Sequence, residues 1–265
     1  MNEVNRTLFI PLYGKSLVSK QGILLNDPTA EQIWEEEKFP IPGKARSKWL
    51  AYNMAMRARV FDEWTTAMLG EYPDALVLQI GCGLDSRCYR VKGAFKNWID
   101  CDFSSVISVR KKYFKETETY HMTGLDASDP EQIKMLPHDK KVILILEGLS
   151  MYLKTEEMHG LFKALQEKYD TLHVLMDVYT KFGVKASKLK NPVKDVGVTT
   201  LYAIDNIENV IHDLPIRFKV EHSFTPARLI DELKPIDRFV FRMLFTRRLY
   251  RMIYRLFELE SERSC

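Results

Sequence analysis

Short apolar segments alternate with helix-forming segments between residues 75 and 176, and this alternation constrains the fold more than any other feature of the sequence. The segments expected to form strands are residues 75–80, 98–102, 120–123, 142–146 and 172–176. Between them, Asp129 followed by Pro130 is typical of a helix start, as is Thr155 ahead of an amphipathic stretch. Strands separated by helices assemble into right-handed βαβ units. The sequence therefore predicts an α/β fold with a mostly parallel sheet and helices on both faces.

The first 70 residues are expected to form a helical N-terminal cap on this core, which spans residues 75–225. No proline interrupts residues 49–69, where Leu50, Arg57 and Phe61 fall on one face at helical spacing. All 265 residues are taken as one domain, since a chain of this length can bury a single large core.

The last third of the chain has a less regular pattern. Residues 181–195 are polar and rich in lysine, which favours a loop or lid. The next expected elements are a strand over 217–224 and a helix over 226–233. Residues 236–265 form a basic amphipathic segment; the apolar spacing over 236–259 favours a helix, although residues 238–245 alone could form a strand.

Composition gives little sign of a charged partner. The 39 Lys and Arg residues nearly balance 36 Asp and Glu residues, so the net charge of +3 offers no argument for nucleic acid. The longest apolar runs fall far short of the roughly 18 residues that span a bilayer. The cysteines show no CxxC pair and no histidine spacing for zinc. A reducing, cytoplasmic location is expected.

Glycines and acids follow successive strands of the expected sheet. Gly81-Cys82-Gly83 comes directly after the first strand, Asp102 closes the second, Asp126 lies beyond the third, and Glu147 ends the fourth. Ligands of open α/β sheets bind at the carboxyl ends of the strands, so these residues are expected to share one site. A dinucleotide fingerprint would need a third glycine where Ser86 stands, which disfavours NAD.

Arg57 is the most informative residue of the N-terminal third. Its helical position puts a guanidinium in line with apolar side chains, whereas Arg59 points elsewhere. A charge in such a place is costly unless an anion pairs with it. That anion could be the carboxylate of a ligand, or the partner in a salt bridge: Asp62, Glu63 or a residue elsewhere.

Four segments in combination resemble the leucine carboxyl methyltransferase family, which includes the tetracenomycin-pathway type of O-methyltransferase. The segments are MRARVFD at 56–62, VLQIGCGLDSR at 77–87, IDCDF at 99–103 and EGLSMYL at 147–153. The resemblance implies a Rossmann-like class I methyltransferase fold with a seven-stranded sheet. It also implies S-adenosylmethionine as cofactor, with S-adenosylhomocysteine as product.

The resemblance further assigns cofactor-binding roles. Arg57 and Lys15 would hold the amino-acid end of the cofactor, with Lys20 close by as an alternative to Lys15. Gly81 and Gly83 would lie against the cofactor, and Glu147 beside its amine. The ribose would be bound by Asp102, with a share for Asp100, and the adenine by Asp126 and Ala127.

The expected reaction is methyl transfer to an oxygen of a small molecule, either a carboxylate or a phenol of a polyketide-like acid. Tyr152 follows the fourth strand closely enough to line the transfer pocket. No metal site or general base is recognised, because the histidines are scattered and expected to be structural or solvent-facing: His121, His159, His173, His212 and His222.

Two other functional classes stay open at this stage. One is an NAD-dependent oxidoreductase on the same sheet. The other is a membrane-associated module without catalysis, in which Arg247, Arg248, Arg251 and Arg255 would lie on an anionic surface beside interleaved apolar residues.

Overall fold

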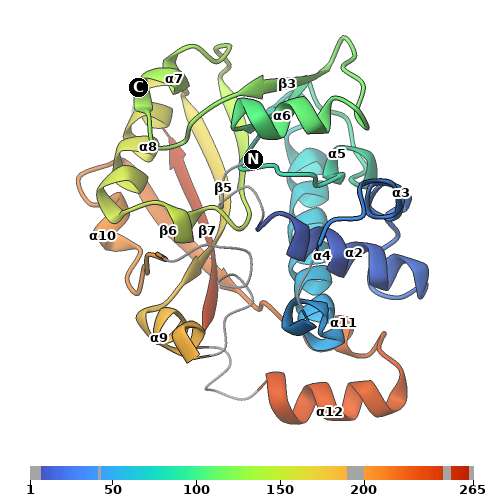
Figure 1. Cartoon of the computed structure of the whole chain (residues 1–265). Helices are drawn as coiled ribbons and strands as arrows, with labels where there is room; N and C mark the ends of the chain where they lie inside the picture. The colour runs from blue at the N-terminus through green and yellow to red at the C-terminus, as the bar shows by residue number, and fades with distance from the viewer. Residues whose placement is uncertain (1–6, 41–42, 190–199, 247–251, 263–265) are drawn as a thin grey trace.

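Seven strands form a single sheet with the order β3-β2-β1-β4-β5-β7-β6 in the computed structural model, which describes residues 7–40, 43–189, 200–246 and 252–262 (Figure 1). The strands are β1 (Leu76–Ile80), β2 (Asn97–Asp102), β3 (Tyr120–Gly124), β4 (Lys141–Leu146), β5 (Thr171–Tyr179), β6 (Ile216–His222) and β7 (Tyr254–Glu262). The first five are parallel, and β7 runs antiparallel to both β5 and β6. The predicted mostly parallel seven-stranded sheet is confirmed.

Helices cover both faces of the sheet. One apolar cluster joins a sheet face to α2 (Phe9–Lys20), α3 (Pro28–Glu37), α4 (Lys48–Glu71), α6 (Ser104–Arg110), α11 (Ala227–Ile230) and α12 (Pro235–Phe245). A second cluster joins the other face to α7 (Pro130–Lys134), α8 (Thr155–Lys168) and α10 (Glu208–Ile211). The remaining helical segments are η1 (Gly43–Arg46), α5 (Arg87–Arg90), η2 (Ser150–Tyr152) and α9 (Lys181–Leu189).

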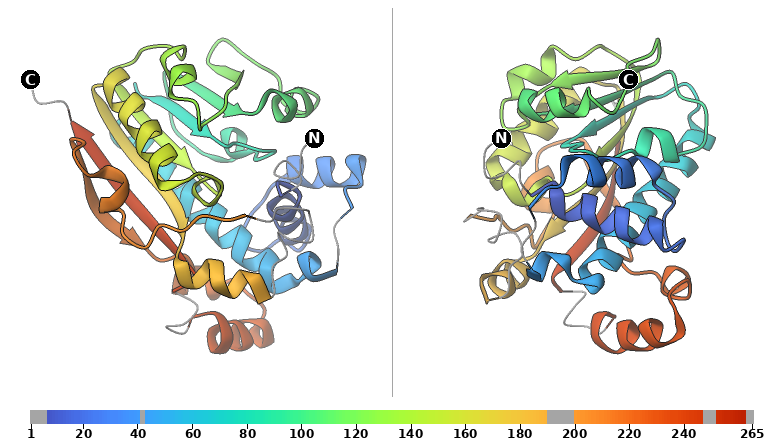
Figure 2. Two further views of the ribbon diagram at one scale, coloured as in Figure 1. Left: turned by 60° about the vertical axis from the view of Figure 1, so that its left-hand side comes forward. Right: turned by 45° about the vertical axis from the view of Figure 1, so that its right-hand side comes forward.

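The expected N-terminal helices pack together beside the sheet. Helix α2 contacts both α3 and the long α4, and Figure 2 shows the three side by side. The start of α7 follows its sequence signal, because the Asp129 carboxylate accepts a hydrogen bond from the Glu131 N–H and Pro130 occupies the first turn. The chain leaves β1 toward β2 on one side and returns to β4 on the other, so a crevice opens between β1 and β4.

The prediction of a loop over residues 181–195 is wrong for its first part. Residues 181–189 form α9, and residues 190–195 lie outside the described residues. Thr180 explains the helix start, since its hydroxyl accepts a hydrogen bond from the Gly183 N–H at 2.9 Å and its carbonyl accepts one from Val184 at 2.9 Å. The polar composition of residues 181–195 did not reveal that Thr180 caps a helix.

The prediction of a helix over residues 236–259 is also wrong for residues 254–259, while residues 247–251 lie outside the described residues. Residues 235–245 form α12, which excludes a strand over 238–245, and residues 254–262 form β7. Strand β7 lies between β5 and β6, where Leu256, Phe257 and Leu259 are buried. Burial from both faces selects an extended inner strand, which helical spacing alone could not reveal. The expected helix over 226–233 shortens to α11.

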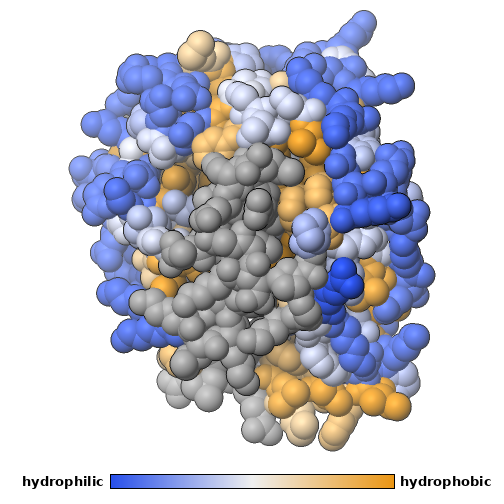
Figure 3. All heavy atoms as spheres, viewed as in Figure 1, coloured by the Kyte–Doolittle hydropathy of each residue, from blue (hydrophilic) through white to orange (hydrophobic). Residues whose placement is uncertain are grey.

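A continuous basic amphipathic helix is therefore absent from the described part of the C-terminal segment. Arg255 lies on β7 and pairs with Glu221 of β6 at 2.6 Å, while Arg247, Arg248 and Arg251 lie outside the described residues. Helix α12 does expose an apolar face, visible at the lower edge of Figure 3 and made of Ile236, Phe239, Met243 and Leu244. Across the described ranges, no helix has both the length and the apolar character to cross a bilayer.

The strand placement of β7 can be tested through Leu259, which is fully buried and stands opposite Val174 and Phe218. Replacing it by alanine is expected to lower the free energy of unfolding by about 2–5 kcal/mol, because it leaves a cavity in the core. The exposed Phe239 of α12 serves as the control, and its alanine variant is expected to stay within about 0.5 kcal/mol of the natural chain. Urea denaturation measures both; equal effects would contradict the placement.

Candidate cofactor-binding and active site

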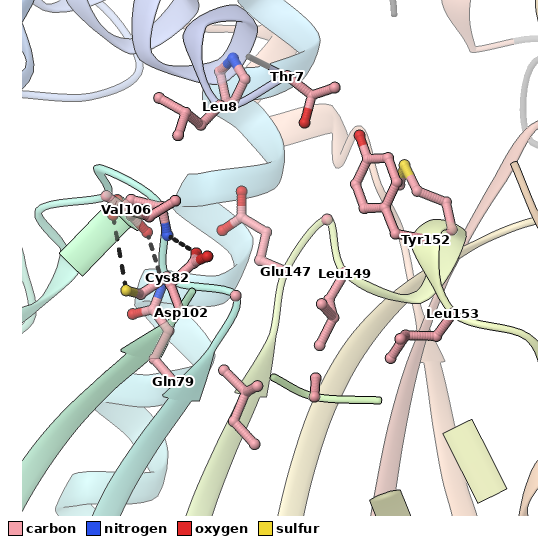
Figure 4. Close-up of a pocket in the computed structure, with 18 of the residues that line it drawn as sticks. Thr7, Leu8, Gln79, Cys82, Asp102, Val106, Glu147, Leu149, Tyr152 and Leu153 are labelled. Carbon is pink, nitrogen blue, oxygen red and sulfur yellow. Dashed lines mark hydrogen bonds between the residues drawn. The ribbon is translucent and has the colours of Figure 1, made fainter. Parts of the chain in front are cut away.

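A cavity of about 420 Å³ lies at the carboxyl ends of β1, β2 and β4. Nearly all site residues expected from the sequence line it: Lys15, Arg57, Gly81, Gly83, Asp102, Asp126, Ala127, Glu147 and Tyr152. In Figure 4, Glu147 projects from the end of β4 between Asp102 on one side and Tyr152 on the other, with Thr7 and Leu8 above. The N-terminal segment therefore covers the crevice that the sheet opens.

The glycine loop after β1 is shaped for a close backbone approach. Gly81 has a φ of +75°, and a Cβ there would lie 3.2 Å from Leu149 Cδ1. The Gly83 N–H donates a hydrogen bond of 2.8 Å to one Asp102 carboxylate oxygen, and the Phe103 N–H donates one of 2.8 Å to the other. Asp102 thus fixes the loop while lining the cavity. Burial raises the pKa of Asp102 even though these two hydrogen bonds lower it.

Asp100 does not line the cavity, so its expected share in ribose binding is corrected. The side chain is fully buried, where it accepts hydrogen bonds from Trp98 Nε1 at 2.9 Å and the Tyr120 hydroxyl at 2.7 Å and pairs with Arg110. Asp100 stands two residues before the strand end, on the same sheet face as Asp102 but about 7 Å lower. That step places it inside the core layer rather than at the crevice.

Arg57 does pair with anions, as its place among apolar residues predicted. Its Nε lies 2.9 Å from Glu147 Oε1, and its Nη1 lies 2.9 Å from Asp177 Oδ2. These two partners lie directly after β4 and near the end of β5, so neither Asp62 nor Glu63 pairs with Arg57. Arg59 points away, toward Glu63 at 3.0 Å. The guanidinium consequently ties α4 to β4 and β5 at the floor of the cavity.

Asp177 supports the cavity floor from below without lining the cavity, and the sequence reasoning missed this role. Its carboxylate accepts a hydrogen bond of 2.5 Å from the Gly148 N–H as well as pairing with Arg57. Gly148 has a φ of +72°, and a Cβ there would lie 3.4 Å from the Arg57 guanidinium. The sequence could have indicated Asp177, because it follows the expected strand over 172–176 just as Glu147 follows the expected strand over 142–146.

A second set of buried ion pairs extends the charged floor of the cavity. Lys15 Nζ lies 2.7 Å from Asp85 Oδ1, and Arg87 joins Asp85 at 3.0 Å and also pairs with Glu147. The alternative to Lys15 is not supported, because Lys20 is paired with Glu35 at the surface. Asp85 and Arg87 belong to the GLDSR segment. The family motif therefore included these two residues, which do not stand at strand ends and were not predicted as site residues.

These pairs set the ionisation of the floor. Burial raises the pKa of Glu147, but the guanidinium groups of Arg57 and Arg87 outweigh it and hold that pKa below its ordinary value. Burial dominates at Asp177 and raises its pKa although Arg57 opposes the shift. Nearby cations also hold the pKa of Asp85 well below its ordinary value despite its burial, so Glu147 and Asp85 are both kept ionised in the cavity floor.

The other side of the cavity is aromatic and apolar. Its lining includes Leu50, Met54, Tyr152, Tyr179, Tyr202 and Tyr254. Burial raises the pKa of Tyr152 to about 12, so its hydroxyl keeps its proton at neutral pH. No histidine occurs among the described residues that line the cavity. This half offers hydroxyl donors and ring surfaces but no imidazole base.

Comparisons with known proteins agree on one kind of enzyme. The family model described as leucine carboxyl methyltransferase matches residues 2–166. The tetracenomycin polyketide synthesis O-methyltransferase TcmP of Streptomyces glaucescens is 25% identical over 240 residues, covering 89% of each chain.

Two solved structures share the fold at low sequence identity. A duf574 family protein from Streptomyces avermitilis matches with a TM-score of 0.60 and 11% identity, covering 89% of this chain and 90% of that chain. The magnesium protoporphyrin IX methyltransferase of Synechocystis, solved with bound SAH, matches with a TM-score of 0.52 and 15% identity, covering 88% and 95%.

Glu147→Gln tests the charged floor through its pH dependence. Because the folded-state pKa of Glu147 is lowered, its ionised form stabilises the fold above the unfolded pKa, and this contribution is lost as the pH falls through the folded pKa. At neutral pH the variant is expected to be less stable by about 3–5 kcal/mol, since Arg57 and Arg87 lose a buried partner. Urea denaturation across acidic and neutral pH should show the two curves converging in acid; a constant gap would contradict the assignment.

Proposed function

Because the chain belongs to the leucine carboxyl methyltransferase family, whose members use S-adenosylmethionine as cofactor, we propose that it methylates an oxygen atom of a small-molecule acid. The observation that carries the proposal is the single cavity shared by Gly81, Asp102 and Glu147, which lie far apart in the sequence. Family membership sets aside the NAD-dependent alternative. The proposed partners are the cofactor and a small-molecule acceptor rather than nucleic acid, and membrane contact through the C-terminal segment is not favoured.

The described residues fit the cofactor by chemistry. Asp102 has carboxylate lone pairs beyond its two backbone hydrogen bonds, and these can accept from ribose hydroxyls. Asp126 and Ala127 line the cavity beyond β3, where we place the adenine. Lys15 and Arg57 supply positive charge for the amino-acid carboxylate, and the ionised Glu147 suits the amine. When bound, S-adenosylmethionine supplies an electrophilic methyl group on a sulfonium sulfur.

We place the acceptor on the aromatic side of the cavity. A carboxylate is ionised at neutral pH and needs no general base, which suits a lining without histidine. The protonated Tyr152 hydroxyl can donate a hydrogen bond that orients such a carboxylate, and positioning supplies most of the rate acceleration in this case. Tyrosine rings favour a planar, polyketide-like acid over an aliphatic one. The name of the Streptomyces relative, which refers to polyketide synthesis, supports the same class.

Asp102→Asn tests the cofactor site. The amide keeps the shape of the side chain but loses the charge and one accepting oxygen, so affinity for S-adenosylhomocysteine is expected to fall at least about tenfold, which is about 1.4 kcal/mol. Asp100→Asn is the matched control, because it should lower the free energy of unfolding through Arg110 and leave cofactor affinity nearly unchanged. Calorimetric titration and urea denaturation measure the two effects. A greater loss of affinity in the Asp100 variant would reverse the assignment.

The acceptor class can be tested with pairs of aromatic acids and phenols that share the same ring system. The expected product is a methyl ester, identified by mass spectrometry and by its cleavage in base. Its kcat should be flat from about pH 6.5 to pH 9, since the acid is already ionised over that range. Formation of methyl ethers alone, with kcat rising as the pH rises, would show that the acceptor is a phenol instead.

Tyr152→Phe refines the same experiment. Loss of the hydroxyl is expected to raise KM for the acid several-fold while S-adenosylhomocysteine affinity stays constant. Tyr89→Phe, at an exposed position, is the control. Equal KM values for the two variants would remove Tyr152 from the acceptor site.

A further inference from the structure

Two histidines that the sequence treated as scattered come together outside the methyl-transfer cavity. His159 lies on α8, and His212 and Asp213 directly follow α10, which packs beside α8 (Figure 1). The imidazole rings are stacked, with centroids 4.7 Å apart and planes inclined by 23°. One nitrogen of each ring and one carboxylate oxygen of Asp213 all lie within 4.8 Å of one another.

The orientation of both rings is fixed by the backbone. His159 Nδ1 lies 2.9 Å from the Val210 carbonyl oxygen, and His212 Nδ1 lies 3.1 Å from the Asn209 carbonyl oxygen. A carbonyl can only accept, so each Nδ1 carries a hydrogen and each neutral ring presents a bare lone pair on Nε2. Metal-binding histidines are commonly oriented in this way, with the second ring nitrogen donating to a carbonyl.

The carboxylate of Asp213 is the third group, and like the two Nε2 lone pairs it can only accept. Asp213 Oδ1 lies 3.7 Å from His159 Nε2 and 3.9 Å from His212 Nε2. Asp213 adopts a φ of +59°, an uncommon conformation for a residue other than glycine, and this places its carboxylate beside both rings. Water can reach these groups, since the side chains of His212 and Asp213 are 63% and 69% exposed, but a cation placed among them would satisfy all three acceptors at once.

We propose that His159, His212 and Asp213 bind a divalent transition-metal ion, with zinc the best match. Two imidazole nitrogens and a carboxylate oxygen are suitable zinc ligands, and hard cations such as Mg²⁺ prefer all-oxygen sites. Tetrahedral coordination at about 2.1 Å places ligand atoms about 3.4 Å apart. The distances to Asp213 Oδ1 need to shorten by a few tenths of an ångström, and the two stacked rings, whose ligand nitrogens lie within 4.8 Å of each other, need to rotate so that their lone pairs converge. Exposed His212 and Asp213 side chains can move that far.

The ion would join two elements that the core already holds in place. Val210 and Ile211 of α10 belong to the same apolar cluster as Met158 and Phe162 of α8, so the ligands stand on a fixed backbone. With three protein ligands, a fourth position stays open to water. The site is separate from the proposed methyl transfer, because none of its three residues lines the cavity.

Calorimetric titration of Zn²⁺ into the tag-free, chelator-treated full chain tests this proposal, with a thiol-free reductant present. One ion per chain is expected, and His159→Ala, His212→Ala and Asp213→Asn should each weaken binding at least about tenfold. His121→Ala, which alters a histidine of β3 outside the cluster, should leave zinc affinity unchanged.

S-adenosylhomocysteine affinity of every variant serves as the measure of folding, because the cluster lies outside the cavity. It should match that of the natural chain, whatever happens to zinc. Undetectable zinc binding by the natural chain would overturn the proposal. Stoichiometric binding that persists in the His159→Ala/His212→Ala double variant would overturn it in favour of the cysteine thiols.

Discussion

The buried guanidinium of Arg57 is the constraint around which the cavity is organised. It holds Glu147 and Asp177, and through them the ends of β4 and β5, against the long helix α4. Removing one partner of such a buried set costs about 3–5 kcal/mol, because the charges left behind have no water to solvate them. A cap helix and two central strands therefore cannot move independently, and the cavity floor is fixed before any ligand arrives.

The same floor combines structural and chemical roles in single residues. Asp102 closes the glycine loop through the Gly83 N–H and still faces the cavity, while Glu147 is held by Arg57 and Arg87 yet projects toward the centre (Figure 4). Groups restrained in this way need little reorganisation when a ligand binds, which is the source of preorganised recognition. The tyrosine-lined side carries no comparable ion pairs among its described residues, and this contrast separates the proposed cofactor and acceptor halves.

Much of the fold could be predicted from local pattern, and the errors have a common cause. Strands β1 and β4 are mainly apolar runs followed by a glycine and an acid, as buried parallel strands favour, and β2, β3 and β5 are recognisable although Asp100, His121 and His173 interrupt their apolar residues. Strand β7 is not such a run, since Arg255, Glu258 and Glu260 interrupt it and pair with charged side chains of the neighbouring strand β6. A residue pattern cannot show that a charge will be neutralised by a segment far along the chain.

Local sequence alone indicated the order of strands and helices from β1 to β5, the glycine loop, and the acids at strand ends, because each depends on residues close together in the chain. Tertiary structure decided which acids face the cavity: it buried Asp100 beneath Arg110, brought Asp177 to Arg57, and set His159 beside His212. These outcomes depend on distances between segments far apart in sequence. Packing sets such distances, and a step of two residues along one strand, about 7 Å, is enough to move a side chain on the same face from the crevice into the core.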